Sequence, residues 1–211
     1  MRQSLLESLA HVPIKSRYKW DCKIKKNQMG YLSEEQLKLM EFCELGSNVL
    51  ISDKASIYNA KNIKLGSNIR IDDFCILSAG EDGIEIGNFI HISCYASLIG
   101  KSKITLGNYV NISSRTSVYS SSDDYSGNFM TGPIVPLTHR NVDDRAVMIE
   151  DHAIIAAQCV VLPGVTIGEG TAIGAFSLVS KNVEPWGIYI GSPLRFLKKR
   201  SDNMLRFLGN V

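Results

Sequence analysis

The sequence predicts a β-solenoid of triangular cross-section, and three features of its pattern predict it. A large aliphatic residue recurs at every sixth position, and a glycine often follows it. The position two before each aliphatic residue is usually small or β-branched, as at Ala96, Thr116 and Cys159. No α-helix has a period of six, and a hairpin sheet would not place glycine at a fixed offset from the aliphatic residue. The aliphatic positions are Leu45, Ile51, Ile57, Leu65, Ile71, Leu77, Ile86, Ile92, Leu98, Leu106, Ile112, Val118, Ile149, Ile155, Val161, Ile167, Ile173 and Val179.

In this architecture each six-residue unit is one short strand and a corner, and three units complete one coil. The aliphatic and the small residue both point inward, and neighbouring coils stack at the inter-strand spacing of about 4.8 Å. A single coil cannot bury its own apolar side chains, so the stack is stable only as a whole. The first four coils begin 20, 21 and 20 residues apart. Because three units need fewer residues than this, we expect the surplus residues at the corners.

The repeat divides the chain into three segments. Residues 1–44 hold a basic lead-in and a short helix, in which Ser33 is the predicted N-cap and Gln36 closes a capping box. Residues 45–190 form the solenoid, and residues 191–211 are expected to form a C-terminal helix that starts after a proline. Both helices would cover the open ends of the solenoid, where core and strand edges are otherwise exposed. Their apolar positions are Leu37, Met40, Phe42 and Cys43 in the first helix, and Leu194, Phe196, Leu197, Met204, Leu205 and Phe207 in the second.

The repeat stops once, in a loop at about residues 119–148. A loop of this length is much longer than the usual connection between strands, and such loops are typically functional.

The composition excludes several classes of protein. A chain of 211 residues with a formal net charge of +2 gives no reason to expect a nucleic-acid partner. Its five cysteines have no metal-site spacing and suggest no disulfide framework, and Cys75 and Cys159 occupy the small interior position of the repeat. No run approaches 18 apolar residues, so we expect no transmembrane segment, no signal peptide and a cytoplasmic location.

The clearest stretch of the repeat, CVVLPGVTIGEGTAIGAFSLVSK from Cys159 to Lys181, resembles the hexapeptide-repeat acyltransferases. The string Gly191-Ser-Pro-Leu-Arg195 is similar to the way that this family leaves its last coil. The resemblance covers roughly residues 45–200. It implies a left-handed parallel β-helix, acetyl-CoA as co-substrate, and a homotrimer with its sites between neighbouring subunits.

The acceptor side of the site departs from the family's pattern. The family commonly carries a histidine base in a Ser/Gly-His-Asp-Tyr-Ser string of the long loop, and here Asp123 stands in its place, followed by Asp124. We expect His91 to be the base instead. It precedes an inward residue, so its side chain points outward, between the matching positions Arg70 and Asn111 of the adjacent coils. Asp123 or Asp124 would then orient the histidine or the sugar. The other histidines are His11, His139 and His152, for which we expect no role in the site.

The donor side follows the family more closely. The resemblance places the pantetheine arm of coenzyme A along the last coils, beside Ala157 and Ala175. It places Ser180, Lys181 and Arg195 where the family's donor site continues, and the two cations would meet phosphate charge.

The resemblance implies an acetyl-CoA-dependent acetyltransferase acting on a sugar hydroxyl in bacterial surface polysaccharide (O-antigen or capsule) synthesis. The alternative is N-acetylation of a nucleotide-linked amino sugar, because a neutral amine needs less help from a base than a hydroxyl. The absence of the loop histidine favours this alternative. A second alternative is a non-catalytic binding or scaffold trimer, since fold alone does not determine function.

Overall fold

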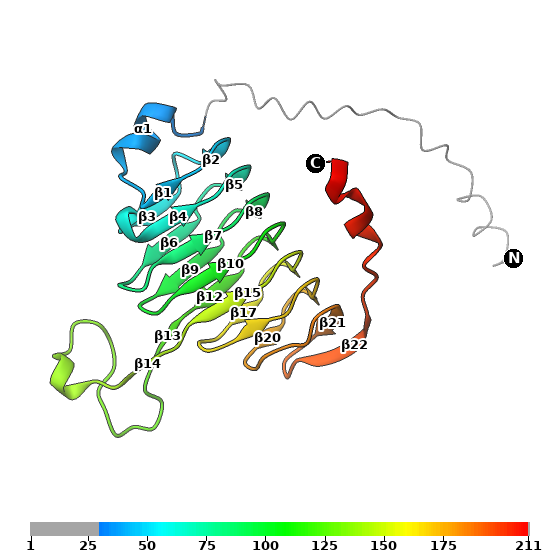
Figure 1. Cartoon of the computed structure of the whole chain (residues 1–211). Helices are drawn as coiled ribbons and strands as arrows, with labels where there is room; N and C mark the ends of the chain where they lie inside the picture. The colour runs from blue at the N-terminus through cyan, green and yellow to red at the C-terminus, as the bar shows by residue number, and fades with distance from the viewer. Residues whose placement is uncertain (1–29, 211) are drawn as a thin grey trace, which may run out of the picture.

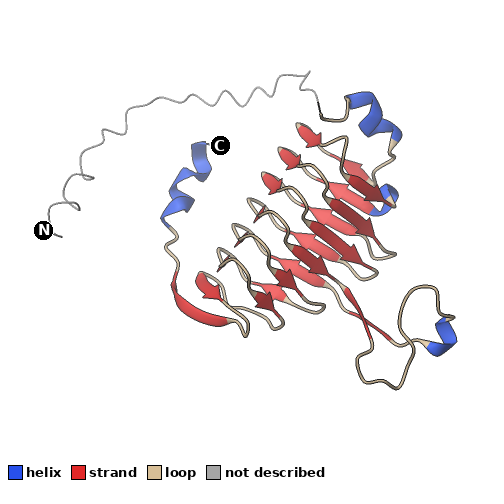
Figure 2. Ribbon diagram, turned by 180° about the vertical axis from the view of Figure 1, so that it is seen from behind, coloured by secondary structure: helices blue, strands red, loops and turns tan. Residues whose placement is uncertain are grey.

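The chain folds into a parallel β-solenoid whose coils stack along one axis (Figures 1 and 2). The computed structural model describes residues 30–210. Its coils cross three parallel sheets in turn, here called sheets I, II and III. Sheet I comprises β1 (Glu44–Leu45), β4 (Ile63–Leu65), β7 (Ile84–Ile86), β10 (Ile104–Leu106), β15 (Val147–Ile149) and β18 (Thr166–Ile167). Sheet II comprises β2 (Val49–Ile51), β5 (Ile69–Ile71), β8 (Ile90–Ile92), β11 (Asn111–Ile112), β16 (Ile154–Ile155), β19 (Ala172–Ile173), β21 (Gly187–Ile190) and the antiparallel β22 (Arg195–Lys199). Sheet III comprises β3 (Ser56–Tyr58), β6 (Ile76–Ala79), β9 (Ser97–Gly100), β12 (Ser117–Tyr119), β17 (Val160–Val161) and β20 (Leu178–Val179).

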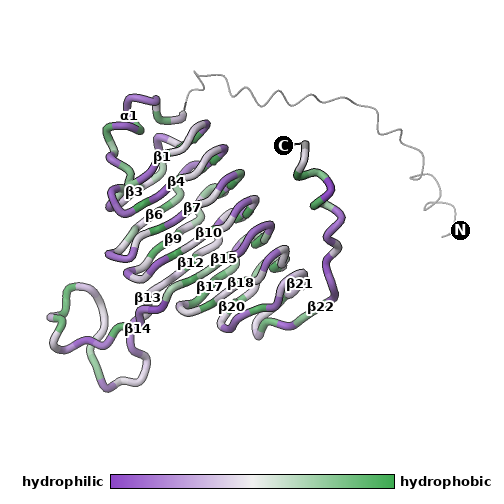
Figure 3. Tube along the Cα trace, viewed as in Figure 1, coloured by the Kyte–Doolittle hydropathy of each residue, from purple (hydrophilic) through white to green (hydrophobic). Residues whose placement is uncertain are grey.

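The six-residue frame predicted from the sequence is the register of the stack. Ile71, Ile92, Ile112, Ile155 and Ile173 lie one above another in sheet II, and each is at most 2% exposed. Figure 3 shows hydrophobic stretches recurring from coil to coil. This single column of side chains, repeated on all three sheets, forms one continuous core.

The small interior positions are also confirmed. Cys75 and Cys159 are fully buried. Burial raises the pKa of the Cys75 thiol to about 11, because the charged thiolate is poorly solvated there. Leu45 is an exception among the aliphatic positions. It is 37% exposed because it belongs to the first strand of sheet I, which has a neighbouring coil on only one side.

The short helix α1 (Glu34–Leu39) begins as predicted. The Ser33 hydroxyl accepts a hydrogen bond from the Gln36 N–H, and the Gln36 side chain accepts one from the Ser33 N–H at 2.8 Å. Leu37 packs into the core at 5% exposure, with Met40 half-buried beside it. Cys43, which the sequence assigned to the same apolar face, is exposed.

The prediction of a helix directly after Pro193 was wrong. Residues 195–199 form β22, which pairs antiparallel with β21, and only then does a 3-10 helix, η3 (Asn203–Asn210), begin. The free edge of β21 has unpaired N–H and C=O groups, and a strand satisfies them where a helix cannot. The Phe196 ring also packs edge-on against Tyr189 at 5.5 Å. The last coil is therefore covered by a strand, and η3 leads away from it (Figure 1).

The long loop leaves the solenoid between β12 and β15. It begins and ends in a two-stranded antiparallel ribbon of β13 (Ser121–Asp123) and β14 (Val142–Asp144), and it contains the 3-10 turn η2 (Leu137–His139). A further 3-10 turn, η1 (Ala60–Asn62), fills an earlier corner of the same edge. The loop projects well clear of the coils (Figure 1). The side chains of Tyr125 and Ile134 in it are each 94% exposed.

Replacing Ile112 with alanine should destabilise the fold by about 2–5 kcal/mol, because Ile112 is fully buried between two coils and its loss leaves a cavity. Urea unfolding monitored by circular dichroism measures the change. Leu39→Ala is the control, since Leu39 is 82% exposed and its removal should change stability little. Equal effects of the two substitutions would contradict the assigned register.

Candidate active site

A corner of the solenoid brings most of the predicted site residues into rows. Five strands of sheet II, β5, β8, β11, β16 and β19, are each followed by a four-residue turn of one common form into sheet III, and we call this edge corner II–III. The turns are residues 72–75, 93–96, 113–116, 156–159 and 174–177. The third residue of each of these turns has a left-handed φ between 58° and 61°, and from Tyr95 onward its N–H donates to the carbonyl of the second turn residue of the preceding coil. The turns are therefore superposed, and equivalent positions form rows parallel to the solenoid axis.

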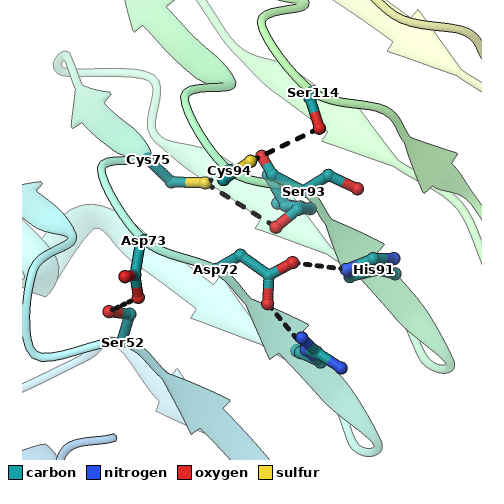
Figure 4. A network of polar contacts seen from close by, with 10 residues as sticks. Ser52, Asp72, Asp73, Cys75, His91, Ser93, Cys94 and Ser114 are labelled. Carbon is teal, nitrogen blue, oxygen red and sulfur yellow. Dashed lines mark hydrogen bonds and ion pairs between the residues drawn. The ribbon is translucent and has the colours of Figure 1, made fainter. Parts of the chain in front are cut away.

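The second turn position contains both alanines of the predicted donor side. Ala157 is half-buried and Ala175 is exposed, and they continue a row formed by Asp73, Cys94 and Ser114 in the earlier coils. The Cys94 thiol lies 3.4 Å from the Ser114 hydroxyl (Figure 4). From Cys94 onward the row carries only small side chains, which leaves room beside it for an extended ligand.

The third turn position carries large side chains outward. The Phe74 and Tyr95 rings stack with their centroids 4.9 Å apart, and the Arg115 guanidinium lies 4.7 Å from the Tyr95 centroid. These contacts support a backbone conformation that is unusual for bulky residues. They also border the row of small side chains on its outer side.

His91 lies next to this corner, on the outer face of β8. It is aligned with Arg70 in β5 and Asn111 in β11, which is the predicted outward ladder. Its Nε2 lies 2.8 Å from Oδ2 of Asp72, and the Arg70 Nε donates to Oδ1 of the same carboxylate at 2.6 Å (Figure 4). Asp72 was missed by the sequence reasoning. The sequence pattern that could have identified it is the separation of Arg70 and Asp72 by two residues. Both side chains then lie on the outer face, where a carboxylate can reach the next coil.

The two loop aspartates lie elsewhere. The loop connects sheet III to sheet I, so Asp123 and Asp124 extend from a different edge, corner III–I. Asp123 is exposed at the end of β13, opposite Val142, and its carboxylate contacts no other described residue through a hydrogen bond or ion pair. Neither aspartate contacts His91 within the described part of the chain, so a single copy does not bring these predicted residues together.

Asp124 shapes the loop. Its carboxylate accepts hydrogen bonds from the N–H and hydroxyl of Ser126 and from the Asn141 side chain at 2.9 Å. These donors, the Ser126 hydroxyl first, lower the pKa of Asp124 below the ordinary aspartate value of 3.8. Because the pKa is lowered, the stabilisation by these contacts is fully present above the ordinary pKa of 3.8. It is lost as the pH falls through the lowered pKa of Asp124.

The remaining donor positions are divided between the two corners. Ser180 and Lys181 follow β20 at corner III–I, and both are exposed. Arg195 is opposite Ile190 at the start of β22, and it too is exposed. Corner II–III thus holds His91, Asp72 and the alanines, while corner III–I holds the loop aspartates and Lys181. Neither edge of one copy holds all of the predicted site residues.

The other described histidines contact neither His91 nor the two loop aspartates. His139 lies in η2 with its Nδ1 2.9 Å from the Thr138 hydroxyl. His152 was expected to be a corner residue, and its ring stacks on Tyr109 at 4.9 Å on the edge between sheets I and II. His11 lies outside the described residues, as does most of the basic lead-in. Within residues 30–210 no cluster of three or more His, Cys, Asp or Glu side chains is placed to hold a metal ion, and no helix is long and apolar enough to cross a membrane.

Residues 146–181 match the family model "Bacterial transferase hexapeptide (six repeats)". The chain is 50% identical over 177 residues to the dTDP-4-amino-4,6-dideoxy-D-glucose acyltransferase of Escherichia coli. The matched region covers 84% of this chain and 92% of that protein. The chain belongs to the hexapeptide-repeat acyltransferases. Membership confirms the predicted family, the left-handed β-helix and the enzyme class.

Solved structures of this acyltransferase family agree in fold and in length. AntD, an N-acyltransferase from Bacillus cereus, was solved with dTDP-4-amino-4,6-dideoxyglucose and coenzyme A. It is 43% identical to this chain with a TM-score of 0.82, over 86% of this chain and 97% of AntD. A further AntD structure contains dTDP and 3-hydroxybutyryl-CoA, at 44% identity and a TM-score of 0.82, over 85% of this chain and 95% of AntD. That these relatives bind coenzyme A agrees with the predicted co-substrate.

Replacing Asp124 with alanine should open the loop, because three hydrogen bonds are lost at once. We expect trypsin cleavage after Arg140, measured by mass spectrometry at pH 8, to accelerate roughly five- to tenfold. Asp123→Ala is the matched control, since its carboxylate has no partner among the described residues and its removal should leave the cleavage rate unchanged. Equal acceleration by both substitutions would contradict the different roles of the two aspartates.

Proposed function

We propose that this chain transfers the acyl group of an acyl-coenzyme A to the amino group of a dTDP-linked 4-amino-4,6-dideoxy sugar. The observation that carries the proposal is the 50% identity to a protein named for this reaction, over 92% of that protein. An AntD structure that contains the amino sugar and coenzyme A together also supports it. O-acetylation of a sugar hydroxyl in surface-polysaccharide synthesis stays a prediction and has less support.

The chemistry of the acceptor fits the residues present. The amine nitrogen attacks the thioester carbonyl, the C–N bond forms, the C–S bond breaks, and coenzyme A leaves as the thiolate. The nitrogen gives up one proton in the process. A neutral amine is already a good nucleophile, so it needs a proton acceptor less urgently than a hydroxyl does. The replacement of the loop histidine by Asp123 is therefore compatible with an amine acceptor.

The acceptor residues take the following roles in this proposal. His91 receives the proton from the nitrogen, Asn111 beside it contributes a hydrogen bond to the sugar, and Asp123 orients the amine. In AntD, one serine was substituted in some structures and one aspartate, ten positions further along, in others, and this spacing does not distinguish the two loop aspartates of this chain. Ser113 with Asp123 has the same spacing here, and so does Ser114 with Asp124.

The donor residues bind coenzyme A along the corner. Ala157 and Ala175 leave space for the pantetheine arm, and the backbone groups of their turns remain close to it. Lys181 and Arg195 are exposed cations suited to phosphate, and Ser180 adds a hydroxyl beside Lys181. The thioester would then point along the row of small side chains toward Cys94 and His91.

We infer that the site is completed between copies of the chain in a homotrimer. Corner II–III of one copy holds His91 and the alanines, and corner III–I of another copy would supply Asp123 and Lys181. A triangular solenoid has three edges, and a closed ring pairs one kind of edge with another at every contact. Each contact would then carry one complete site.

Thiol release from acetyl-CoA and from 3-hydroxybutyryl-CoA tests the reaction. We expect turnover with dTDP-4-amino-4,6-dideoxyglucose and none with the matched sugar that carries a hydroxyl at the same carbon. Asp123→Asn should lower kcat/KM by about 10²–10⁴, the range for loss of a positioned polar group at the reacting atoms. Asp82→Asn, an exposed aspartate at an earlier turn of corner III–I, is the control and should retain activity.

Two outcomes would contradict the proposal. Turnover of the hydroxyl sugar alone would favour O-acylation. Failure of coenzyme A to raise the melting temperature would favour a non-catalytic scaffold, because a ligand that binds only the native state must stabilise it.

Replacing Lys181 with alanine should weaken coenzyme A binding by about two- to fivefold, and the effect should shrink with added salt, as expected for an exposed charge contact. Isothermal titration calorimetry measures the dissociation constant. Lys61→Ala is the matched control, because Lys61 is an exposed lysine on the same corner near the other end of the solenoid. Equal loss with both variants would indicate non-specific attraction only.

A further inference from the structure

The Asp72 carboxylate is held from both sides. One oxygen accepts from the Arg70 Nε at 2.6 Å and the other lies 2.8 Å from the His91 Nε2 (Figure 4). Its side chain is only 16% exposed, compared with 38% for His91 and 53% for Arg70. Among residues 30–210, no other histidine side chain contacts a carboxylate. The pair therefore combines a largely buried anchor with an accessible imidazole.

This contact determines which ring nitrogen can accept a proton. A carboxylate accepts hydrogen bonds and cannot donate them, so the hydrogen must lie on Nε2 of His91. In the neutral ring the lone pair is then on Nδ1. The Arg70 guanidinium, which is always charged, holds the other oxygen and prevents the carboxylate from turning away.

The position of the pair suits the acyl-transfer site. His91 belongs to the same coil as Cys94 and lies two coils from Ala157, about 10 Å along the axis at the inter-strand spacing. Figure 4 shows the imidazole beside the corner that carries Ser93, Cys94 and Ser114. A thioester that extends along the row of small side chains approaches this edge of the ring.

We propose that Asp72 is a positioning residue that fixes His91 in the Nε2–H tautomer, so that Nδ1 takes the proton from the acceptor nitrogen as the C–N bond forms. The imidazolium then returns this proton to the departing thiolate, which restores the neutral ring. The inference rests on the proposed function and deepens it, since it assigns the atom that receives the proton and the side chain that selects it.

The test uses Asp72→Asn in the full-length chain. The asparagine retains size and shape, but it can donate to Nε2 and so allows the other tautomer. We expect kcat to fall by about 10²–10⁴, with KM for both substrates within about twofold, as expected for loss of a tautomer-fixing carboxylate. Long-range ¹H–¹⁵N spectra should place the His91 hydrogen on Nε2 in the wild type and on Nδ1 in the variant. The chain has four histidines, so the His91→Gln spectrum identifies the signal.

Asp73→Asn is the matched control. Asp73 is the neighbouring residue of the same turn, but its carboxylate contacts the Ser52 hydroxyl at 2.6 Å and the Lys54 ammonium at 2.8 Å instead. Its substitution should change neither the His91 tautomer nor kcat. Asp72→Glu should restore part of the lost activity, and the binding of coenzyme A should be unaffected in all these variants.

Two results would overturn the inference: an unchanged kcat in Asp72→Asn, or a lower kcat with the hydrogen still on Nε2. The tautomer measurement needs no acceptor, so it separates this inference from the proposed function. If the wild type acylates no amino sugar, the proposed function is refuted, and so is the amine as the source of the proton. This holds whichever tautomer of His91 is observed.

Discussion

The fixed register between coils is the constraint on which the rest of the structure depends. At corner II–III, the N–H of the residue that follows each inward isoleucine donates to the carbonyl of the isoleucine one coil further on. The bonds from Asp72 to Ile92, from Ser93 to Ile112 and from Ser113 to Ile155 are all 2.9 Å long. A slip of one residue would turn every inward side chain outward, so burial of the aliphatic column enforces this register. The outward side chains of the strands and turns are then aligned from coil to coil as strictly as the core side chains.

The candidate site uses this alignment. Small residues at one turn position form a row because their turns are superposed, and His91 meets Asp72 because β5 and β8 are paired with Arg70 opposite His91. Neither feature requires a cavity in the core. The proposed catalytic groups can therefore lie on the outer surface of a rigid stack, where a substrate would be held between surfaces rather than inside one domain.

The sequence was informative wherever the structure is periodic. The frame of buried aliphatic residues, the buried Cys75 and Cys159, and the ladder that includes His91 and Asn111 all follow from a period of six with alternating side chains. The capping box was predictable because Ser33 and Gln36 interact across three residues only. Each of these features follows from interactions between residues close in sequence, or from the repetition of one such pattern along the chain.

The sequence failed where the contact is specific to one place. The strand β22 depends on the free edge of β21, and the apolar residues Phe196 and Leu197 fit a helix equally well by pattern. Asp72 escaped notice because its role depends on a side-chain rotamer that reaches the next coil and on Arg70, which fixes it. The position of Asp123, on a different edge from His91, could not be predicted, because the loop that carries it follows no sequence repeat.

The loop also explains why Asp123 and Asp124 lie on a different edge from His91. It is inserted at corner III–I, between β12 and β15, yet β10 still pairs with β15 and β12 with β17 in the unbroken register. A corner can lengthen without disturbing the stack, because the inter-coil hydrogen bonds are made by the strands that flank it. The insertion places Asp123 far from the row that contains Ala157 and Ala175. Residues from the two edges can act on one substrate only if one copy's loop lies against another copy's corner, so catalysis by this arrangement would depend on assembly as strictly as the fold depends on register.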